Sequence, residues 1–495
     1  MTRTVIGIDS STQSTKVVAF DAAGNALAEG RASHDIASPA PGHHEQDPDW
    51  WWDALRTALG ELWQSVDAGS VDAIAISNQR ETVAFLDASG AALRPAMLWL
   101  DERAFTTYEA FAERLGHEFL HRTTGKPIDV IPVANRLDWM RQNEPETLDA
   151  TATIADVQAY LTGRLTGRRC ASWSSADPFG ILDIQAMDWS IPILEAVGVR
   201  RDQLPELVRP GSLVGRVTKE AAERLGLKTD TPVFAAGGDG QCAGLGTNAF
   251  EAGTIYLNLG TATITGVYSP TPAINRNWRT MTGPTGEGYF LESIQKTGAF
   301  FVNWVVDTFC GGRDDPHVFE RLEAEAAKLP VGADGVTMTP HLAGVMNPHW
   351  DPAARVAIVG LSANHGKAHL YRAAIEAITV EIARGIAAMR GEGLTLERIR
   401  AIGGGANSPL WMQMIADATG LPVERSTTVE ASALGAAIIA ATGEGWFGSF
   451  DAAAHAMTRV AGIVMPQPSE RAEWDRFSHR QAGLYGATKA YGRDW

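Results

Sequence analysis

Residues 9–16 read Asp-Ser-Ser-Thr-Gln-Ser-Thr-Lys, and this polar stretch separates two runs rich in Val, Ile and Phe, at residues 4–8 and 16–20. The pattern predicts two strands joined by a short turn. A turn built from Asp, Ser, Thr and Gln exposes hydroxyl and backbone N–H groups at one point, which suits an anion or a hydrated cation. A hydroxyl-rich turn that binds nothing is the plainer alternative, and this stretch alone does not separate the two.

A related arrangement recurs in the second half of the chain. Residues 254–259 and 264–268 are again β-rich, and the turn between them, residues 260–263, reads Gly-Thr-Ala-Thr. Two such units in a chain of 495 residues predict two lobes of similar design that face each other across a cleft. A boundary near residues 246–253 divides the chain into lobes 1–247 and 248–495.

The rest of the sequence alternates strand-like and helix-like segments, such as a buried strand at residues 73–76 and an amphipathic helix at residues 370–389. This alternation predicts an α/β protein. No window approaches the roughly 18 apolar residues of a membrane span, and the first residues lack the pattern of a signal peptide. We therefore expect a cytoplasmic location.

Charge narrows the range of partners. The chain has 42 Lys and Arg residues against 58 Asp and Glu residues, a formal charge of −16. Such an acidic chain is not expected to bind nucleic acid or an anionic membrane through its net charge. Three widely spaced cysteines indicate neither a disulfide framework nor a zinc site.

Two further loops carry candidate chemistry. Asp239 follows a strand-like run and lies among glycines, so it is a candidate general base, with a helix-capping Asx turn as the alternative. Residues 403–405 are three glycines that lead into a helical segment, which suits a flat ring or a phosphate close to the backbone. Gly366-Lys367 lacks the upstream glycine of a Walker A sequence, so a P-loop fold is disfavoured.

Taken together, these stretches resemble the FGGY family of carbohydrate kinases over essentially the whole chain. Residues 9–16 resemble the first phosphate loop of the family, although Ser11 stands where a glycine is common. Residues 260–263 resemble the second phosphate loop, and residues 360–376 the family signature. The resemblance implies the duplicated actin-like, hexokinase-like ATPase fold, with ribonuclease H-like lobes and a central cleft.

The resemblance also implies roles for individual residues. ATP and Mg²⁺ would be the cofactors, Asp239 the catalytic base, and Asp9 and Asp239 the metal ligands. The nucleotide would be bound by the loop residues Ser11, Thr12, Gln13, Lys16, Gly260, Thr261, Thr263, Gly298, Gly404, Gly405, Ala406 and Asn407.

The acceptor, a small sugar or polyol, is expected beside a cluster of polar residues and one tryptophan. Arg80 and Glu81 can donate to and accept from neighbouring hydroxyls, and Trp99 offers an apolar face for C–H groups. A surface ion pair beside a core tryptophan is the plainer interpretation. The predicted acceptor-binding residues are Gln79, Arg80, Glu81, Trp99, Asp101, Asp239 and Gln241.

Residues 78–82 and Trp99 resemble the glycerol kinase version of this site, but three neighbours do not. Ile131 stands in place of a tyrosine, Gly240 in place of a glutamine and Ile264 in place of a phenylalanine. These changes remove hydrogen bonds and open space, which favours an acceptor longer than glycerol. Residues 99–103 and 237–239 resemble the pentulose kinases, which favours a ketopentose of the xylulose type, although xylulose kinases usually have a Met-His pair where this chain has Gln79-Arg80.

A different class of function stays open at this stage. The same fold serves ATP-binding switch proteins that move their lobes and have no small acceptor. The Arg80, Glu81 and Trp99 group argues against that class. Kinases that resemble this chain are often homodimers, but the sequence identifies no interface.

Overall fold

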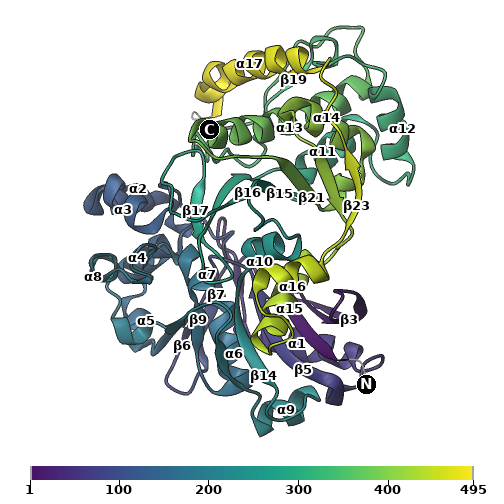
Figure 1. Ribbon diagram of the computed structural model, residues 1–495. Coiled ribbons are helices and arrows are strands. Elements are labelled where there is room, and N and C mark those ends of the chain that lie inside the picture. The colour runs from purple at the N-terminus through teal and green to yellow at the C-terminus, as the bar shows by residue number, and fades with distance from the viewer. Residues whose placement is uncertain (1–2, 493–495) are drawn as a thin grey trace.

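The computed structural model describes residues 3–492 and shows two lobes, each built on a central sheet (Figure 1). The N-terminal lobe holds a six-stranded sheet in the order β13-β14-β5-β1-β2-β3. Neighbouring strands β1 and β2 are antiparallel, whereas β1 and β5, and then β5 and β14, are parallel. The strands are β1 (Thr4–Ser10), β2 (Ser14–Phe20), β3 (Ala26–Ser33), β5 (Val71–Asn78), β13 (Leu213–Arg216) and β14 (Pro232–Gly238).

The C-terminal lobe repeats this design in a seven-stranded sheet, ordered β17-β18-β16-β15-β21-β22-β23. Antiparallel β15 and β16 correspond to β1 and β2, and the parallel strands β21 and β22 correspond to β5 and β14. The predicted duplication is therefore present. The strands are β15 (Thr254–Leu259), β16 (Thr263–Ser269), β17 (Arg279–Thr282), β18 (Tyr289–Gln295), β21 (Arg398–Ile402), β22 (Val423–Ser426) and β23 (Val460–Val464).

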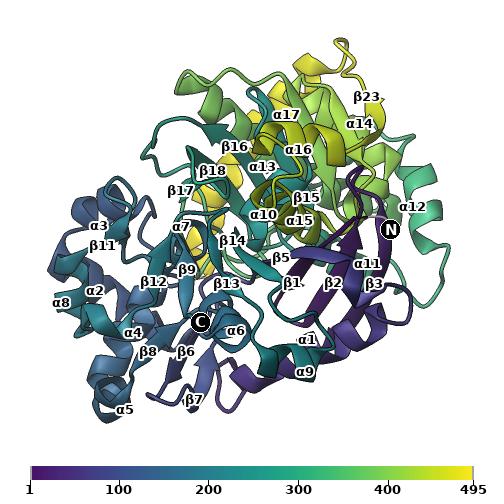
Figure 2. The ribbon, with the colours of Figure 1, turned by 60° about the horizontal axis from the view of Figure 1, so that its bottom comes forward.

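An additional unit extends the N-terminal lobe. A four-stranded sheet, β4-β7-β6-β8, packs beside a group of short helices at one side of the molecule (Figure 2). Its strands are β4 (Glu45–Gln46), β6 (Val83–Leu86), β7 (Ala92–Met97) and β8 (Thr153–Ala155). Its helices are α2 (Tyr108–Leu115), α3 (His117–Thr124), α4 (Val133–Asn143), α5 (Pro145–Ala150), α7 (Trp173–Ala176) and α8 (Ile191–Val197).

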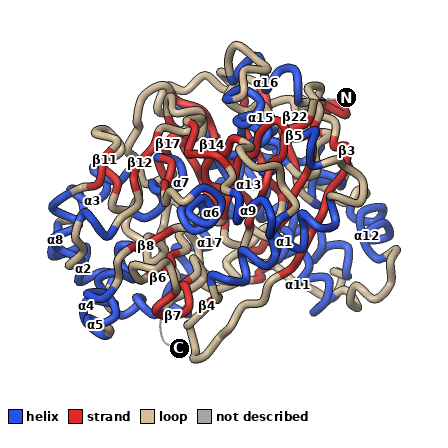
Figure 3. The backbone as a smooth tube through the Cα atoms, turned by 90° about the horizontal axis from the view of Figure 1, so that it is seen from below, coloured by secondary structure: helices blue, strands red, loops and turns tan. Residues whose placement is uncertain are grey.

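Helices α1 (Pro48–Leu62), α6 (Val157–Thr166) and α9 (Lys219–Leu225) cover one face of the N-terminal sheet (Figure 3). Alternation along β1 explains the core: Ile6 and Ile8 face these helices, whereas Val5 faces the other side. Asp47 starts α1 by accepting from a backbone N–H of its first turn, next to Pro48 at a position where proline is well tolerated.

Helices α10 (Asp239–Gly246) and α15 (Ala431–Gly443) lie between the two sheets and pack against each other. Helix α15 approaches both β1 and α10 closely. A Cβ on Gly7 of β1 would lie 1.9 Å from the carbonyl oxygen of Ala433 in α15, and a Cβ on Gly435 of α15 would lie 1.9 Å from the carbonyl oxygen of Cys242 in α10. Alanine and glycine therefore dominate α15. Although its sequence belongs to the C-terminal half, α15 packs on β1 and β5, an arrangement that a division after residue 247 does not describe.

The remaining helices pack on the outer face of the C-terminal sheet. They are α11 (Ala299–Phe309), α12 (Val318–Ala326), α13 (Lys367–Gly391), α14 (Pro409–Thr419) and α17 (Arg471–Thr488), and α16 (Phe450–Met457) contacts α15. The strand predicted at residues 73–76 and the helix predicted at 370–389 are confirmed as parts of β5 and α13. Within residues 3–492, no helix combines the length and the apolar character that a bilayer crossing requires.

Candidate active site

The first polar turn lies between β1 and β2. The backbone N–H and the hydroxyl of Ser11 both donate to the carbonyl oxygen of Ser14, at 3.0 and 2.9 Å, and so close the turn. At its tip Thr12 is half-buried and Gln13 is exposed, and Thr12 Oγ1 accepts a hydrogen bond from Trp99 Nε1 at 2.8 Å. The turn thus presents polar groups at the surface of the lobe while Trp99 holds one of its hydroxyls.

Charged side chains flank this turn. Asp9 and Lys16 lie opposite each other across β1 and β2, and Lys16 Nζ is 2.5 Å from Glu430 Oε2, just before α15. Burial and the nearby Asp239 carboxylate raise the pKa of Asp9 to about 7. A buried carboxylate whose pKa is raised by a second carboxylate nearby is suited to share a hard cation such as Mg²⁺ with it. The donor set therefore fits that metal.

The second turn, between β15 and β16, is sealed by the start of α11. The N–H of Gly298 donates to the Thr261 carbonyl oxygen and that of Ala299 to the Gly260 carbonyl oxygen, each at 2.8 Å. A Cβ on Gly298 would lie 2.4 Å from Thr263 Oγ1. A side chain therefore has no room there, and the structure brings the second turn and Gly298 together.

The third loop follows β21. Gly403 has a φ of +88°, and a Cβ on it would lie 2.7 Å from the backbone of Leu259, the last residue of β15. The next four residues form a 3-10 turn in which Gly405 and Ala406 are buried and Gly404 and Asn407 are exposed. The predicted nucleotide residues of the second and third loops thus meet at the carboxyl ends of β15 and β21.

Asp239 begins α10, and its side chain is 36% exposed. Its Oδ1 accepts from the backbone N–H of Gly240 at 2.7 Å and pairs with Arg80 Nε at 3.1 Å. Among residues 3–492, no group hydrogen-bonds to its Oδ2. Desolvation raises the pKa of the Asp239 carboxyl, and the Arg80 guanidinium opposes the rise. The result is an accessible carboxylate with one oxygen available for a ligand.

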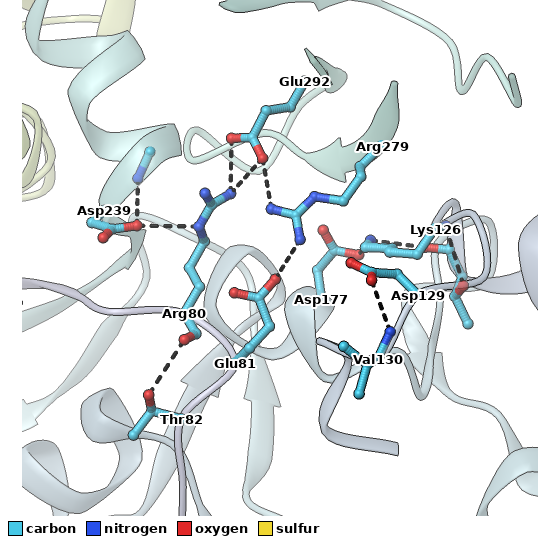
Figure 4. Close-up of polar contacts among 12 residues, drawn as sticks. Arg80, Glu81, Thr82, Lys126, Asp129, Val130, Asp177, Asp239, Arg279 and Glu292 are labelled. Atoms are coloured by element: carbon cyan, nitrogen blue, oxygen red, sulfur yellow. Dashed lines mark hydrogen bonds and ion pairs between the residues drawn. The ribbon is translucent and has the colours of Figure 1, made fainter. Parts of the chain in front are cut away.

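Arg80 belongs to a buried chain of alternating charges that joins the two lobes (Figure 4). Its Nη1 lies 2.9 Å from Glu292 Oε2, and Arg279 Nη2 lies 2.7 Å from Glu292 Oε1. Arg279 Nη1 continues the chain to Glu81 Oε1 at 2.7 Å. Although desolvation acts in the opposite direction, the two arginines lower the pKa of Glu292. The order Asp239, Arg80, Glu292, Arg279, Glu81 fixes the orientation of each member.

A second buried ion pair supports the neighbouring loop. Lys126 Nζ pairs with Asp177 Oδ1 and also donates to the carbonyl oxygens of Thr124 and Thr280, at 2.8 and 3.0 Å. Thr282 donates its backbone N–H to Asp177 Oδ2 at 3.0 Å. Both oxygens of this carboxylate are therefore satisfied, and the pair ties the loop after α3 to β17.

Two predicted acceptor residues, Gln79 and Asp101, are paired with other protein side chains. Gln79 is 1% exposed and hydrogen-bonds with Gln46 and Thr82, at 3.2 and 3.1 Å. Both carboxylate oxygens of Asp101 accept from Arg103, and its side chain is fully buried. The polar groups of both residues are therefore paired with other protein groups in the interior.

Gln241 also lies inside the protein. Its Oε1 is 3.5 Å from Arg80 Nη1, and its Nε2 donates to the carbonyl oxygen of Ser174 at 3.2 Å. The structure thus groups Arg80, Glu81, Asp239 and Gln241, whereas the Trp99 indole reaches the first turn.

Three charged residues of the site escaped sequence reasoning: Arg279, Glu292 and Glu430. Arg279 and Glu292 are cross-strand partners on β17 and β18. A signal was available, because Glu292 is the one charged residue in the strand-like run of residues 289–294, Tyr-Phe-Leu-Glu-Ser-Ile, and a charge in a buried strand requires a partner. That partner could not be identified without the register of the strands.

Comparison with known proteins agrees with this geometry. The model of the FGGY carbohydrate kinase N-terminal domain matches residues 4–246, and that of the C-terminal domain matches residues 255–444. The chain belongs to the FGGY family of carbohydrate kinases. It is accordingly an ATP-dependent phosphotransferase with an alcohol group as acceptor.

Relatives of this carbohydrate kinase differ in the acceptor that they are named for. Xylulose kinase of Staphylococcus epidermidis is 29% identical over 98% of the chain and 97% of the relative. Gluconokinase of Bacillus subtilis is 26% identical over 91% of the chain and 90% of the relative. The crystal structure of xylulose kinase from Rhodospirillum rubrum superposes with a TM-score of 0.92 at 27% identity, covering 99% of this chain and 100% of that one.

Proposed function

We propose that this carbohydrate kinase transfers the γ-phosphoryl group of ATP to a hydroxyl of a neutral ketopentose of the xylulose type. The observation that carries the proposal is the buried chain from Asp239 to Glu81, which places one accessible carboxylate beside groups that recognise hydroxyls. The similarity to proteins named xylulose kinase supports the choice of sugar.

Asp239 would act as the general base. As the acceptor oxygen attacks the γ-phosphorus, its proton passes to the carboxylate, and the bond between the γ-phosphorus and the β–γ bridging oxygen breaks to release ADP. The raised pKa of Asp239 increases its affinity for that proton, while Arg80 favours the ionised form that can accept it. A positioned base of this kind typically contributes about 10²–10⁴-fold in rate.

Asp9 and Asp239 would hold Mg²⁺, which when bound offsets the negative charge of the phosphate oxygens. Lys16 would contribute a further positive charge at the first turn. Thr12, Thr261 and Thr263, with the neighbouring backbone N–H groups, would bind phosphate oxygens. Gly298 and the loop from Gly404 to Asn407 would accommodate the rest of the nucleotide, because side chains are small there.

The charge of the acceptor region favours a neutral substrate. Arg80 and Arg279 are paired with Glu292, and Lys126 is paired with Asp177, so none of these three cations is free to bind an anionic acceptor such as gluconate. Hydroxyl groups, by contrast, can donate to carboxylates.

The wall of this region favours an acceptor longer than glycerol. Ile131 is 8% exposed and clusters with Ile294 and Met346, and Ile264 packs against the same cluster. Aliphatic side chains there offer no hydroxyl or amide to a substrate and occupy less space than the aromatic groups of glycerol kinases. The number of hydrogen bonds available to a short triol is correspondingly reduced.

The test is the release of ADP from Mg-ATP with a panel of acceptors: D-xylulose, L-xylulose, D-ribulose, L-ribulose, glycerol, erythritol, xylitol and gluconate. We expect one ketopentose to have the highest kcat/KM. The Asp239→Asn variant is the control, and it should bind nucleotide normally while losing transfer by about 10²–10⁴-fold.

Other outcomes would contradict the proposal. Preference for gluconate would show that local charge does not select the acceptor, and preference for glycerol would show that the aliphatic wall does not lengthen the site. Stimulation by no acceptor in the panel would contradict the proposed substrate class.

A further inference from the structure

A carboxylate oxygen is buried without a partner at the edge of the acceptor region. Asp129 lies in the loop between α3 and α4, and its Oδ1 accepts the backbone N–H of Val130 at 2.8 Å. Its Oδ2 is buried and forms no hydrogen bond within residues 3–492. Leaving such an atom unsatisfied is costly, so a buried carboxylate of this kind requires an explanation.

Asp177, another buried carboxylate of the same region, differs from Asp129 in that both of its oxygens have partners. Asp177 has Lys126 on one oxygen and the backbone N–H of Thr282 on the other. Asp129 has no ion pair within 4.0 Å in the part of the chain that the structure describes. Desolvation raises its pKa, and the more distant charge of Lys296 opposes the rise. The protein therefore supplies partners for both carboxylate oxygens of Asp177 but for only one of Asp129.

Asp129 adjoins residues that we assign to the acceptor region. The two residues that follow it, Val130 and Ile131, belong to the aliphatic cluster that walls the acceptor region. Asp129 interacts electrostatically with Arg279 and Glu81, the far end of the charged chain that starts at Asp239. Figure 4 shows Asp129 on the same side of the site as Glu81, with its second oxygen turned away from Val130.

We propose that Asp129 is a specificity-determining residue whose Oδ2 accepts a hydrogen bond from an acceptor hydroxyl distant from the one that is phosphorylated. This inference rests on the proposed function and adds a second anchor to it. Asp239 binds the reacting end of the sugar, and Asp129 binds a hydroxyl at the other end. A three-carbon acceptor bound at Asp239 would be too short to donate a hydrogen bond to Asp129 Oδ2, whereas a five-carbon acceptor would supply that donor.

The expected size of the effect follows from the chemistry of the contact. A hydrogen bond to an ionised carboxylate contributes more than one between neutral groups, and a site built to bind a hydroxyl rejects the analogue that lacks it. An aliphatic residue at position 129 would remove the bond without leaving an unpaired charge. Asn would keep an oxygen acceptor and should retain part of the preference.

The experiment compares wild type, Asp129→Leu and Asp129→Asn on two substrates. One is the best ketopentose of the panel, and the other is its deoxy analogue that lacks the terminal hydroxyl at the end that is not phosphorylated. The ratio of the two kcat/KM values should be about 10-fold or more in the wild type and about 2-fold or less in Asp129→Leu. Asp129→Asn should lie between them, and the change should appear mainly in KM.

Asp177→Asn is the matched control, because it alters a buried carboxylate of the same region that already has its partners. It should lower stability and reduce kcat/KM for both substrates alike, leaving their ratio unchanged. Circular dichroism and thermal unfolding of all variants establish that they are folded. A wild-type ratio near 1, or an undiminished ratio in folded Asp129→Leu, would overturn the proposal.

Failure of the proposed function would appear elsewhere, in the wild-type panel. If another acceptor were preferred, the ratio would be measured with that acceptor and its own terminal deoxy analogue. Loss of discrimination in Asp129→Leu would then still support the role of Asp129, and unchanged discrimination would overturn it.

Discussion

Asp9 and Lys16 stand opposite each other across β1 and β2, and Asn258 and Ile264 stand opposite each other at the matching end of β15 and β16. The two hairpins share their topology, but only the first carries charges at this point. The first is tied to the rest of the site by an ion pair with Glu430, the second by backbone contacts around Gly298. In the proposed function, the first hairpin would hold the metal and the second would bind phosphate through its backbone.

The largest expected effect comes from removing the charge that distinguishes the first hairpin. Asp9→Asn should lower kcat by about 100-fold or more, because the metal that offsets the phosphate charge would lose a carboxylate ligand. Asn258→Ala, the matched change in the second hairpin, should lower it by less than about 10-fold. Steady-state kinetics at saturating ATP and acceptor, over a range of Mg²⁺ concentrations, measures both. Equal losses in the two variants would remove the distinction between the hairpins.

The second hairpin should instead be sensitive to added volume. In Gly298→Ala the new methyl group would meet Thr263 Oγ1 at 2.4 Å and the Gly260 carbonyl oxygen at 2.8 Å. Overpacking of this kind typically costs about 1–3 kcal/mol, so we expect KM for ATP to rise by about 10-fold.

Gly462→Ala is the control for that change, since a Cβ at Gly462 has no neighbour within 4 Å. Its KM for ATP should match that of the wild type. Unchanged ATP affinity in Gly298→Ala would show that the second turn yields to the methyl group and is not a fixed binding surface.

A smaller effect is expected from the ion pair that links the first hairpin to α15. Lys16 and Glu430 are about one-fifth exposed, at 22% and 21%, so the pair is partly screened by solvent. Glu430→Gln should change KM for ATP by about 2- to 5-fold at low salt, and the difference should shrink as salt is added. A difference that does not depend on salt would assign Glu430 a steric role.

The smallest expected effect is a loss of folding stability at acid pH, which we attribute to His34. Gln46 Nε2 donates to His34 Nδ1 at 3.0 Å and to the Thr12 carbonyl oxygen at 2.7 Å, and burial lowers the pKa of His34 to about 4. Since an unfolded histidine titrates near 6.5, the unfolded chain binds more protons between pH 6.5 and 4. The stability contributed by neutral His34 is therefore present above pH 6.5 and is lost as pH falls through this window.

Urea unfolding of the wild type and His34→Gln between pH 7.5 and 5 tests this expectation. The free energy of unfolding of the wild type should fall more steeply with acid than that of the variant. Parallel pH profiles would show that His34 does not make the first hairpin acid-sensitive.

The parts of the fold that were predictable are those written in local sequence. Residues 4–20 form two β-rich runs around a polar turn, and the same pattern at residues 254–268 indicated the second lobe. Adjacent side chains and turn residues decide such hairpins, so no knowledge of distant segments is needed. The family resemblance then placed Asp9, Asp239 and the three loops, which the structure brings to the ends of β1, β14, β15 and β21.

Contacts between distant segments could not be predicted in this way. Arg80 and Glu292 come from different lobes, and Lys16 and Glu430 lie at opposite ends of the chain. The direction in which a side chain points was equally unpredictable. Asp101 has a carboxylate that could bind an acceptor hydroxyl, yet it pairs with Arg103. These features depend on register and packing, which composition and spacing do not specify.

The position of α15 has a consequence for how the protein is made on the ribosome. β14 ends at Gly238, but α15, which covers the apolar face of β1 and β5, is complete only at Gly443. During the translation of these intervening 205 residues, the first sheet has one face without its cover. At synthesis rates of about 5–20 residues per second, that interval lasts roughly 10–40 s, long enough for the nascent chain to require protection from aggregation.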